Sequence, residues 1–278
     1  MNQRALPGGA PALIDYHMHT PLCHHALGEP AEYLTEACRQ GLLEIGFADH
    51  YPLGLLGIEL KNKVSMDPEE LPGYISEIRA LGEGQNRVRV KLGAEVDYLP
   101  EKEKALARLL DGAPFDFVIG SVHFIGDWDF THPRHAEKYE SADLPQIYRR
   151  YFELIWQACS SGLFDIIGHI DVIKKFGHRL PDREMEPFWK ETARVLKKND
   201  ICFELNTAGR AAPAGEFYPG RPLLELCREE GVPVTLGSDA HAPEQVGRYF
   251  DEARALLREV GYRELAVFTK RRRSSIPL

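Results

Sequence analysis

The stretch FDFVIGSVH, residues 115–123, is a nearly continuous apolar run that ends on a histidine. Six further runs of the same kind occur along the chain. They are ALIDYH (12–17), LEIGFADH (43–50), VRVKLGAEV (88–96), FDIIGHI (164–170), ICFELN (201–206) and VPVTLGSDAH (232–241). Runs without polar alternation are typical of strands that are covered on both faces of a parallel sheet. The sequence therefore predicts seven such strands.

The segments between these runs have the apolar spacing of helices with one polar face, and several end on glycine, as helices often do. They are residues 30–42, 67–83, 144–162, 183–199, 221–231 and 243–261. Alternating strands and helices form βαβ units with a parallel sheet. Seven units favour an α/β fold that closes into a barrel related to the eight-stranded TIM barrel. An open doubly wound sheet is the alternative.

Length and composition predict one domain that spans residues 1–278. A chain of 278 residues with 44% apolar content can bury a full core, and no linker interrupts it. Residues 1–11 and the basic segment KRRRSSIPL (270–278) are expected to be flexible tails. The five cysteines are odd in number and include no CxxC pair, so we expect reduced core residues rather than disulfides or a thiolate zinc site.

Charge limits the classes of partner. The net charge of −8 is unfavourable for binding a nucleic-acid backbone, so a small-molecule substrate is expected. The chain has no signal-like start, and no apolar stretch approaches the roughly 18 residues of a membrane span. We therefore expect a cytoplasmic protein with no membrane partner; the sequence does not predict an oligomeric state.

Side chains that bind metals through nitrogen or oxygen lie at or just beyond the ends of the apolar runs. They are His17, His19, His25, His50, Glu95, His123, His169, Asp239 and His241. His17 and His19 are two residues apart on a predicted strand and face the same side, and Asp239 and His241 repeat this spacing. Because parallel strands place their carboxyl ends together, these side chains are expected to meet where barrels build active sites.

Glu95 follows the apolar run VRVKLGA, where a carboxylate is costly to bury unless it is paired or coordinated. A carboxylate can bridge two ions, and we expect this role for Glu95; a surface salt bridge is the alternative. His50, His123 and His169, each taken alone, could equally be hydrogen-bonded core histidines. Imidazoles and carboxylates without cysteine suit Zn, Mn or Fe. Two such ions about 3.5–4 Å apart can generate a bridging hydroxide, which favours hydrolysis of a phosphate ester.

Several motifs together resemble the histidinol-phosphate phosphatases of the polymerase-and-histidinol-phosphatase (PHP) superfamily. They are DYHMHTPLCHHA, GFADHYPL, GAEVDY, FVIGSVHF, IGHIDVIKKFGHR, FELNTAGRAAP and TLGSDAHAPEQVG, in this order and across nearly the whole chain. The resemblance implies a distorted seven-stranded (β/α)7 barrel with three divalent metal ions. It also implies metal-dependent hydrolysis of L-histidinol phosphate to L-histidinol and phosphate, a step of histidine biosynthesis.

The resemblance also implies which ligands share an ion. The first ion would be held by His17, His19, Glu95 and Asp239. The second would be held by the bridging Glu95 with His123 and His169, and the third by His25, His50 and His241. His25 is preferred over His24 because the first cluster in the family reads Cys, any residue, His. Catalytic roles are expected for Glu95, Asp239 and His241.

Substrate phosphate needs cations beyond the metals, and Lys175, Arg179 and Arg210 follow strands whose ends form the site. After NTAG, members of the family usually carry leucine and then basic residues, whereas this chain carries Arg210-Ala211-Ala212, which puts the role of Arg210 in question. Trp128, flanked by Asp127 and Asp129, suits an aromatic, cationic ligand. A surface loop whose tryptophan packs on the barrel is the alternative.

Other functions remain open at this point. A PHP-type phosphoesterase or exonuclease could act on nucleotides or nucleic-acid ends, although the acidic balance argues against it. Amidohydrolases also begin with HxH, but they usually bridge their metals with a lysine where this chain has Glu95. A non-catalytic metal-binding module is a third possibility. Cys23 is expected to pack rather than to act as a nucleophile, and surface positions are expected for the remaining histidines, which are His24, His132, His135 and His178.

Overall fold

The seven predicted runs form the seven parallel strands of one sheet. The structure is a computed structural model that describes residues 13–59, 63–84 and 87–278. The strands are β1 (Ile14–Met18), β2 (Glu44–Phe47), β3 (Arg89–Asp97), β4 (Phe117–Ser121), β7 (Ile166–Ile167), β8 (Cys202–Asn206) and β9 (Val234–Gly237). Each strand pairs with the next one along the chain. The predicted flexible tail at residues 1–11 lies outside the described residues.

The sheet curves until its first and last strands meet. The His19 amide donates to the Ala240 carbonyl at 2.9 Å, and the Ala240 amide donates to the His17 carbonyl at 3.1 Å. A parallel bridge between Met18 and Ala240 therefore joins the ends of β1 and β9. The result is a nearly closed seven-stranded barrel, and the open doubly wound alternative is wrong.

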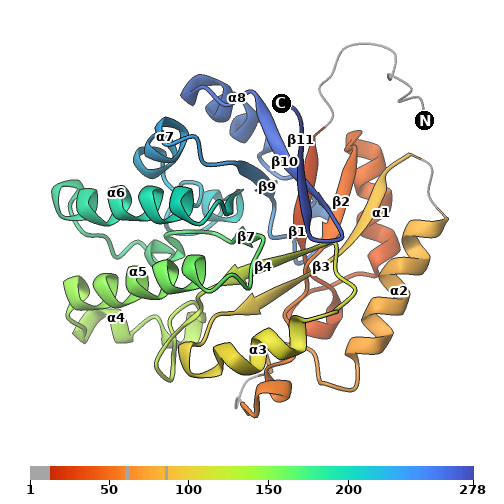
Figure 1. The fold of residues 1–278 in the computed structure, drawn as a ribbon, viewed down its shortest axis with the longest axis horizontal. Helices are drawn as coiled ribbons and strands as arrows, with labels where there is room; N and C mark the ends of the chain where they lie inside the picture. The colour runs from red at the N-terminus through yellow and green to blue at the C-terminus, as the bar shows by residue number, and fades with distance from the viewer. Residues whose placement is uncertain (1–12, 60–62, 85–86) are drawn as a thin grey trace.

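Helices surround the barrel in the order of the chain (Figure 1). They are α1 (Pro30–Gln40), α2 (Leu71–Glu83), α3 (Glu103–Leu110), α4 (Lys138–Ser141), α5 (Leu144–Ser160), α6 (Asp182–Lys198), α7 (Arg221–Glu229) and α8 (Phe250–Val260). Helices form in all six predicted segments. Because the helices cover the strands from outside, nearly every strand residue is buried, which explains the continuous apolar runs. No helix of the described residues is long and apolar enough to cross a membrane.

Aromatic side chains fill the inside of the barrel. Tyr16 of β1 stacks on Phe117 of β4 with ring centroids 4.7 Å apart, and both are fully buried. Glycines on β2 and β3 leave the space for the Phe117 ring, since a Cβ atom at Gly46 or Gly93 would lie 2.6 Å or 2.4 Å from it. All five cysteines are free, and four of them are buried, as expected for reduced core residues.

The prediction that residues 270–278 form a flexible tail is wrong. Residues 272–277 form β11 (Arg272–Pro277), which pairs antiparallel with β10 (Glu264–Thr269). The hairpin closes the amino-terminal end of the barrel, where the Phe268 amide donates to the Tyr16 hydroxyl at 3.0 Å. Thr235 of β9 donates from its hydroxyl to the Ala266 carbonyl at 3.0 Å.

Two of the four basic residues of this segment form ion pairs with acidic residues in loops. Arg271 forms an ion pair with Asp165, and it donates to the Leu163 carbonyl at 2.6 Å. Arg273 pairs with Asp200 at 2.6 Å. Loops that connect helices to strands at the bottom of the barrel carry both carboxylates, which lie far from the hairpin in sequence. Arg271 and Arg273 therefore anchor the C-terminal hairpin to these two loops.

We predict that Arg271→Ala lowers the free energy of unfolding by about 1–2 kcal/mol, because it removes a charge-assisted hydrogen bond and leaves the partly buried Asp165 without its cation. Arg272→Ala is the matched control, since Arg272 is exposed and forms no ion pair with any described residue. Chemical denaturation measures both variants. Equal stability of the two proteins would contradict the anchoring role of Arg271.

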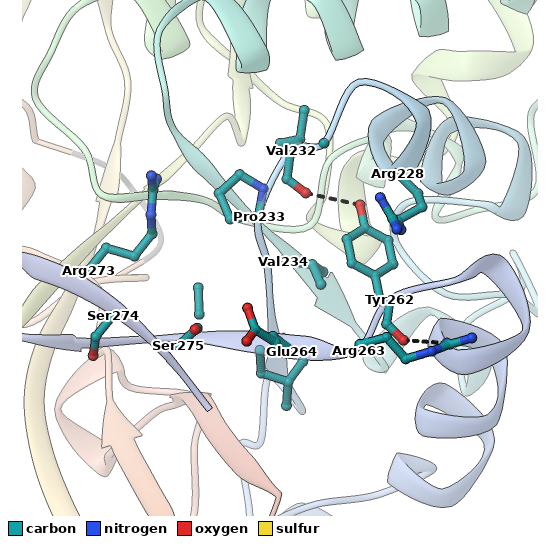
Figure 2. Close-up of a pocket in the computed structure, with 13 residues that line it drawn as sticks. Arg228, Val232, Pro233, Val234, Tyr262, Arg263, Glu264, Arg273, Ser274 and Ser275 are labelled. Atoms are coloured by element: carbon teal, nitrogen blue, oxygen red, sulfur yellow. Dashed lines mark hydrogen bonds between the residues drawn. The ribbon is translucent and has the colours of Figure 1, made fainter. Parts of the chain in front are cut away.

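A cavity of about 570 Å³ lies at this amino-terminal end, between the hairpin and the segment that enters β9 (Figure 2). Tyr262 lines it, donates from its hydroxyl to the Val232 carbonyl at 3.2 Å, and packs against the Arg228 guanidinium. No histidine is among the described residues that line this cavity. The candidate metal ligands belong to a different cavity, at the opposite end of the strands.

Candidate metal centre

The barrel brings all nine predicted metal ligands to the carboxyl ends of its strands. They surround the bottom of a cavity of about 780 Å³. His17 and His19 are fully buried beneath this cavity, and Glu95 is 2% exposed. Seven of the nine line the cavity wall; these are His25, His50, Glu95, His123, His169, Asp239 and His241.

His17, His19, Glu95 and Asp239 form the first group. The Nε2 atoms of His17 and His19 lie 3.4 Å and 3.6 Å from the same oxygen, Oε2 of Glu95. They lie 3.9 Å and 3.2 Å from Oδ1 of Asp239. The HxH spacing at the end of β1 therefore directs both rings to one point. Four ligand atoms that converge in this way match the coordination number of a protein-bound zinc ion.

The ring nitrogens in this group are suited to bind a cation. The Nε2 atoms of His17 and His19 are buried and have no hydrogen-bond partner in the described protein. Buried polar atoms almost always have partners, and leaving one without costs about 1–3 kcal/mol. Each atom faces carboxylate oxygens of both Glu95 and Asp239, at 3.2–3.9 Å. A divalent metal ion between them would satisfy the two imidazoles and the two carboxylates together.

His123 and His169 form the second group with Glu95. The His169 Nε2 atom lies 2.8 Å from Oε1 of Glu95, and the His123 Nε2 atom lies 3.5 Å from the same oxygen. The two Nε2 atoms are 3.2 Å apart. A tetrahedral zinc ion with Zn–N bonds of about 2.0–2.1 Å would hold two nitrogens about 3.3 Å apart. Glu95 thus presents one oxygen to each of two histidine groups, as a bridging ligand would.

His25 and His241 face each other in the third group, with their Nε2 atoms 3.0 Å apart. His50 lies nearby, its ring centroid 5.4 Å from that of His25. However, its Nδ1 atom is 3.0 Å from Oε2 of Glu95, so in this structure His50 points toward the first group. The buried Cys23 thiol could join His25 and His241 in holding an ion. Cys23 is therefore closer to the metal chemistry than the sequence indicated.

Most of these histidines bind a protein oxygen through their second ring nitrogen. The partners are a carboxylate for His17 (Glu204, 2.8 Å), His19 (Asp49, 3.4 Å) and His123 (Asp97, 2.9 Å), and a backbone carbonyl for His25 (Cys23, 2.7 Å) and His241 (Asp239, 3.1 Å). Such contacts fix the tautomer and aim the free nitrogen at a metal. These three carboxylates are not among the site residues predicted from the sequence. Each lies in or next to an apolar run, which is the signal that identified Glu95.

Glu204 connects two of the groups. Its Oε1 atom accepts from His17, and its Oε2 atom accepts from the His169 amide at 2.9 Å and from Asn206 Nδ2 at 3.0 Å. The carboxylate is 1% exposed and lies on β8, next to the strand that carries Gly237. One buried side chain therefore orients a ligand of the first group and the backbone of a ligand of the second.

The buried charges of the site depend on one another. Burial alone would raise the pKa of Glu95, but His50, His17 and His123 outweigh it and hold this pKa well below its usual range. Burial would lower the pKa of His123, whereas Asp97 and Glu95 raise it to about 9. Glu95 is therefore ionised and ready to bind a cation. A metal ion would take the place of the proton that His123 holds.

Asp239 and His241 come together through a turn. β9 ends at Gly237, and Asp239 has the left-handed φ of 53°, which is uncommon for residues other than glycine. Strand alternation, the basis of the prediction, therefore does not explain why their side chains meet, 3.5 Å apart between Asp239 Oδ1 and His241 Nδ1. A strained turn at candidate metal ligands is typical of functional sites.

Only one of the three predicted phosphate-binding cations reaches the cavity. Lys175 lines it, and its ammonium donates to the Thr131 carbonyl at 3.1 Å. Burial lowers the pKa of Lys175. Arg179 instead pairs with Glu216, and Arg210 pairs with Glu252 at 3.0 Å on the surface. Neither arginine lines the cavity. Their ion pairs with Glu216 and Glu252 explain why Arg179 and Arg210 lie outside the cavity.

The loop after β4 places its acidic residue, rather than its tryptophan, in the cavity. Asp129 lines the cavity, and its Oδ1 atom accepts from the Thr131 and His132 amides, both at 3.1 Å. Trp128 packs edge-on against Tyr139, with ring centroids 4.8 Å apart, and does not line the cavity. Among the histidines expected at the surface, His24 and His132 line the cavity rim.

Known proteins resemble this chain over nearly its full length. The PHP domain pattern matches residues 15–208, and a PHP-associated pattern matches residues 223–259. A probable histidinol-phosphatase of Deinococcus radiodurans is 42% identical over 252 residues, which cover 90% of this chain and 95% of that protein. The histidinol-phosphatase of Lactococcus lactis is 28% identical over 266 residues, which cover 92% of this chain and 94% of that protein.

Solved structures include a protein with the same fold. It is the crystal structure of histidinol phosphate phosphatase from Lactococcus lactis complexed with zinc, L-histidinol and phosphate. The match has a TM-score of 0.81 at 27% identity and covers 94% of this chain and 98% of that chain.

Proposed function

This chain belongs to the PHP domain family, and we propose that it hydrolyses L-histidinol phosphate to L-histidinol and phosphate. The observation that carries the proposal is the convergence of nine candidate metal ligands at one end of the barrel, with two buried imidazole nitrogens that lack hydrogen-bond partners in the described protein. The relatives named as histidinol-phosphatases support the substrate. The enzyme would then serve histidine biosynthesis, and we place it with other cytoplasmic metabolic enzymes.

We propose three divalent ions, with zinc as the first choice because the Lactococcus lactis structure contains it, and manganese or iron as alternatives. The first group would hold one ion, Glu95 with His123 and His169 a second, and His25, His50 and His241 a third. Bound metal ions supply charge neutralisation for the phosphate and lower the pKa of water. Glu95 is the proposed bridge because its two oxygens face different histidine groups.

The protein side chains would position the reaction. Asp49, Asp97 and Glu204 hold their histidines in one tautomer, so the ligand atoms need little rearrangement when substrate binds. Water is the proposed nucleophile: its oxygen forms the new bond to phosphorus, and the ester bond to the histidinol oxygen breaks on the opposite side. No phosphorylated protein should form. A single turnover in ¹⁸O-labelled water should place one labelled oxygen in the phosphate.

The cavity also carries groups that complement the rest of the substrate. Lys175 would contact the phosphate, because this residue lines the cavity and no carboxylate of the described residues forms an ion pair with it. L-Histidinol carries an amino group and an imidazole. Asp129 is the proposed partner of that amino group, since it lies on the cavity wall near Lys175. The loop amides of Thr131 and His132 both donate to its Oδ1 atom, so its Oδ2 atom is available to the substrate.

The test of the proposed substrate is a comparison of kcat/KM across phosphate esters. The panel contains L-histidinol phosphate, sugar phosphates, p-nitrophenyl phosphate, nucleotides and DNA with terminal phosphates. We expect kcat/KM for L-histidinol phosphate to exceed that for the simple esters by at least about 100-fold. Esters without the amino group and imidazole would leave polar groups of the site without partners, which allows discrimination of this size. A clear preference for nucleotides or DNA ends would contradict the proposal.

A further inference from the structure

Arg248 lines the metal cavity and forms no ion pair with any described residue. It lies in the turn between β9 and α8, beside the candidate ligands Asp239 and His241. Of the other cations that line the cavity, Lys63 pairs with Asp67 at 2.6 Å and is mostly exposed, whereas Lys175 and Arg134, like Arg248, form no ion pair with a described residue. Because no carboxylate of the described residues pairs with Arg248, its charge is available to a ligand.

Two backbone carbonyls hold the guanidinium of Arg248 in place. Its Nε atom donates to the Ser238 carbonyl at 3.1 Å, and its Nη2 atom donates to the Asp239 carbonyl at 3.3 Å. These contacts use one edge of a group that has five N–H donors. The Nη1 hydrogens and one Nη2 hydrogen remain. They form the end-on pair with which arginine binds two oxygens of a phosphate.

A buried carboxylate holds two backbone positions next to this arginine, one in the strand-end segment that it contacts and one directly before it in the chain. Asp15 accepts from the Ser238 amide at 2.9 Å through Oδ1 and from the Gly247 amide at 3.0 Å through Oδ2. Gly247 has a φ of 64°, so the turn that precedes Arg248 favours glycine. The guanidinium is therefore held in position before substrate arrives, which reduces the entropy that binding would cost.

We propose that Arg248 binds the phosphate group of the substrate and at the same time holds the turn that carries Asp239. This inference rests on the proposed function, because it names a residue that would recognise the substrate of the same site. The Asp239 carbonyl accepts from both Arg248 and His241 Nδ1. A phosphate on Arg248 would thus lie next to the ligands that hold the metal ions.

The test measures calorimetric binding of inorganic phosphate, and separately of L-histidinol, to the metal-loaded enzyme. Arg248→Gln keeps an N–H donor for the carbonyls but removes the charge. We expect it to weaken phosphate binding by about 10- to 100-fold, the usual effect of losing a charge-assisted bidentate contact, while metal content and L-histidinol binding stay unchanged. Arg248→Lys should lie between Arg248→Gln and the wild type.

Arg254→Gln is the matched control, since Arg254 lies on α8 and pairs with Asp251 at 3.0 Å. It should bind both products as the wild type does. Wild-type phosphate affinity in Arg248→Gln would overturn the proposal. Parallel loss of metal, phosphate and L-histidinol in both Arg248 variants would also overturn it, because Arg248 would then only hold the turn. If phosphate binding depends on Arg248 but L-histidinol phosphate is not hydrolysed, the proposed substrate is wrong and this inference stands.

Discussion

Replacing Glu95 with glutamine is expected to lower kcat/KM for L-histidinol phosphate by about 10³-fold or more. Loss of one preorganised electrostatic group typically costs up to about 10³-fold, and Glu95 serves two metal groups. Glu95 is buried, and its two oxygens face five histidines: His123 and His169 through Oε1, and His17, His19 and His50 through Oε2. The variant removes negative charge from two metal groups at once. Elemental analysis should show about two equivalents less metal than in the wild type.

His50→Ala is the matched control for Glu95→Gln. His50 is partly exposed, and its removal leaves the contacts of Glu95 with the other four histidines in place. We expect it to lose about one equivalent of metal, from the group that contains His25 and His241. Equal metal loss in the two variants would show that Glu95 does not bridge two sites.

Replacing Gly237 with alanine is expected to disrupt the metal site indirectly, by displacing the side chain of Glu204, which orients His17. A Cβ atom at Gly237 would lie 1.8 Å from Oε1 of Glu204 and 2.7 Å from Cβ of His17. Glu204 would have to move away from His17, which it now orients at 2.8 Å. We predict a loss of metal affinity of about 10- to 100-fold. The free energy of unfolding should fall by about 1–3 kcal/mol, as is usual when a packed core receives an extra methyl group.

Gly73→Ala provides the control for the added methyl group. Gly73 lies in α2, and nothing lies within 4 Å of a Cβ atom at this position. Alanine is favoured over glycine in helices, so this variant should gain up to about 1 kcal/mol of stability and keep its metals. Unchanged metal affinity in Gly237→Ala would contradict the role of Glu204 as the carboxylate that orients His17.

The sequence predicted the barrel and the meeting of the nine candidate ligands at one end of it, because both follow from local pattern. A strand that is covered on both faces must be apolar, so a histidine or acid at its end stands out, as His123 does after FDFVIGSV. The ends of parallel strands then meet because of topology alone. The same argument applied inside an apolar run would have found Glu204, which interrupts ICFELN much as Glu95 follows VRVKLGA.

The cations and the hairpin depend on contacts between distant residues. Arg179 and Arg210 follow the expected strands, but Glu216 and Glu252 bind them, and no local pattern reveals this competition. The turn of the C-terminal hairpin consists of Lys270 and Arg271, both with left-handed φ, where Asn-Gly is usual. Because the sequence has no Asn-Gly turn here, residues 270–278 resemble a basic tail rather than part of a hairpin.

The central claim is that this barrel is a phosphatase that needs several metal ions, and titration of the metal-free enzyme tests it most directly. Protein stripped by a chelator is supplied with increasing zinc, while bound metal and phosphate release from L-histidinol phosphate are measured on the same samples. We predict no release without metal and a plateau as bound metal approaches three equivalents, in keeping with nine ligands that share Glu95. Full activity in metal-free protein, or a plateau at one equivalent, would contradict this account.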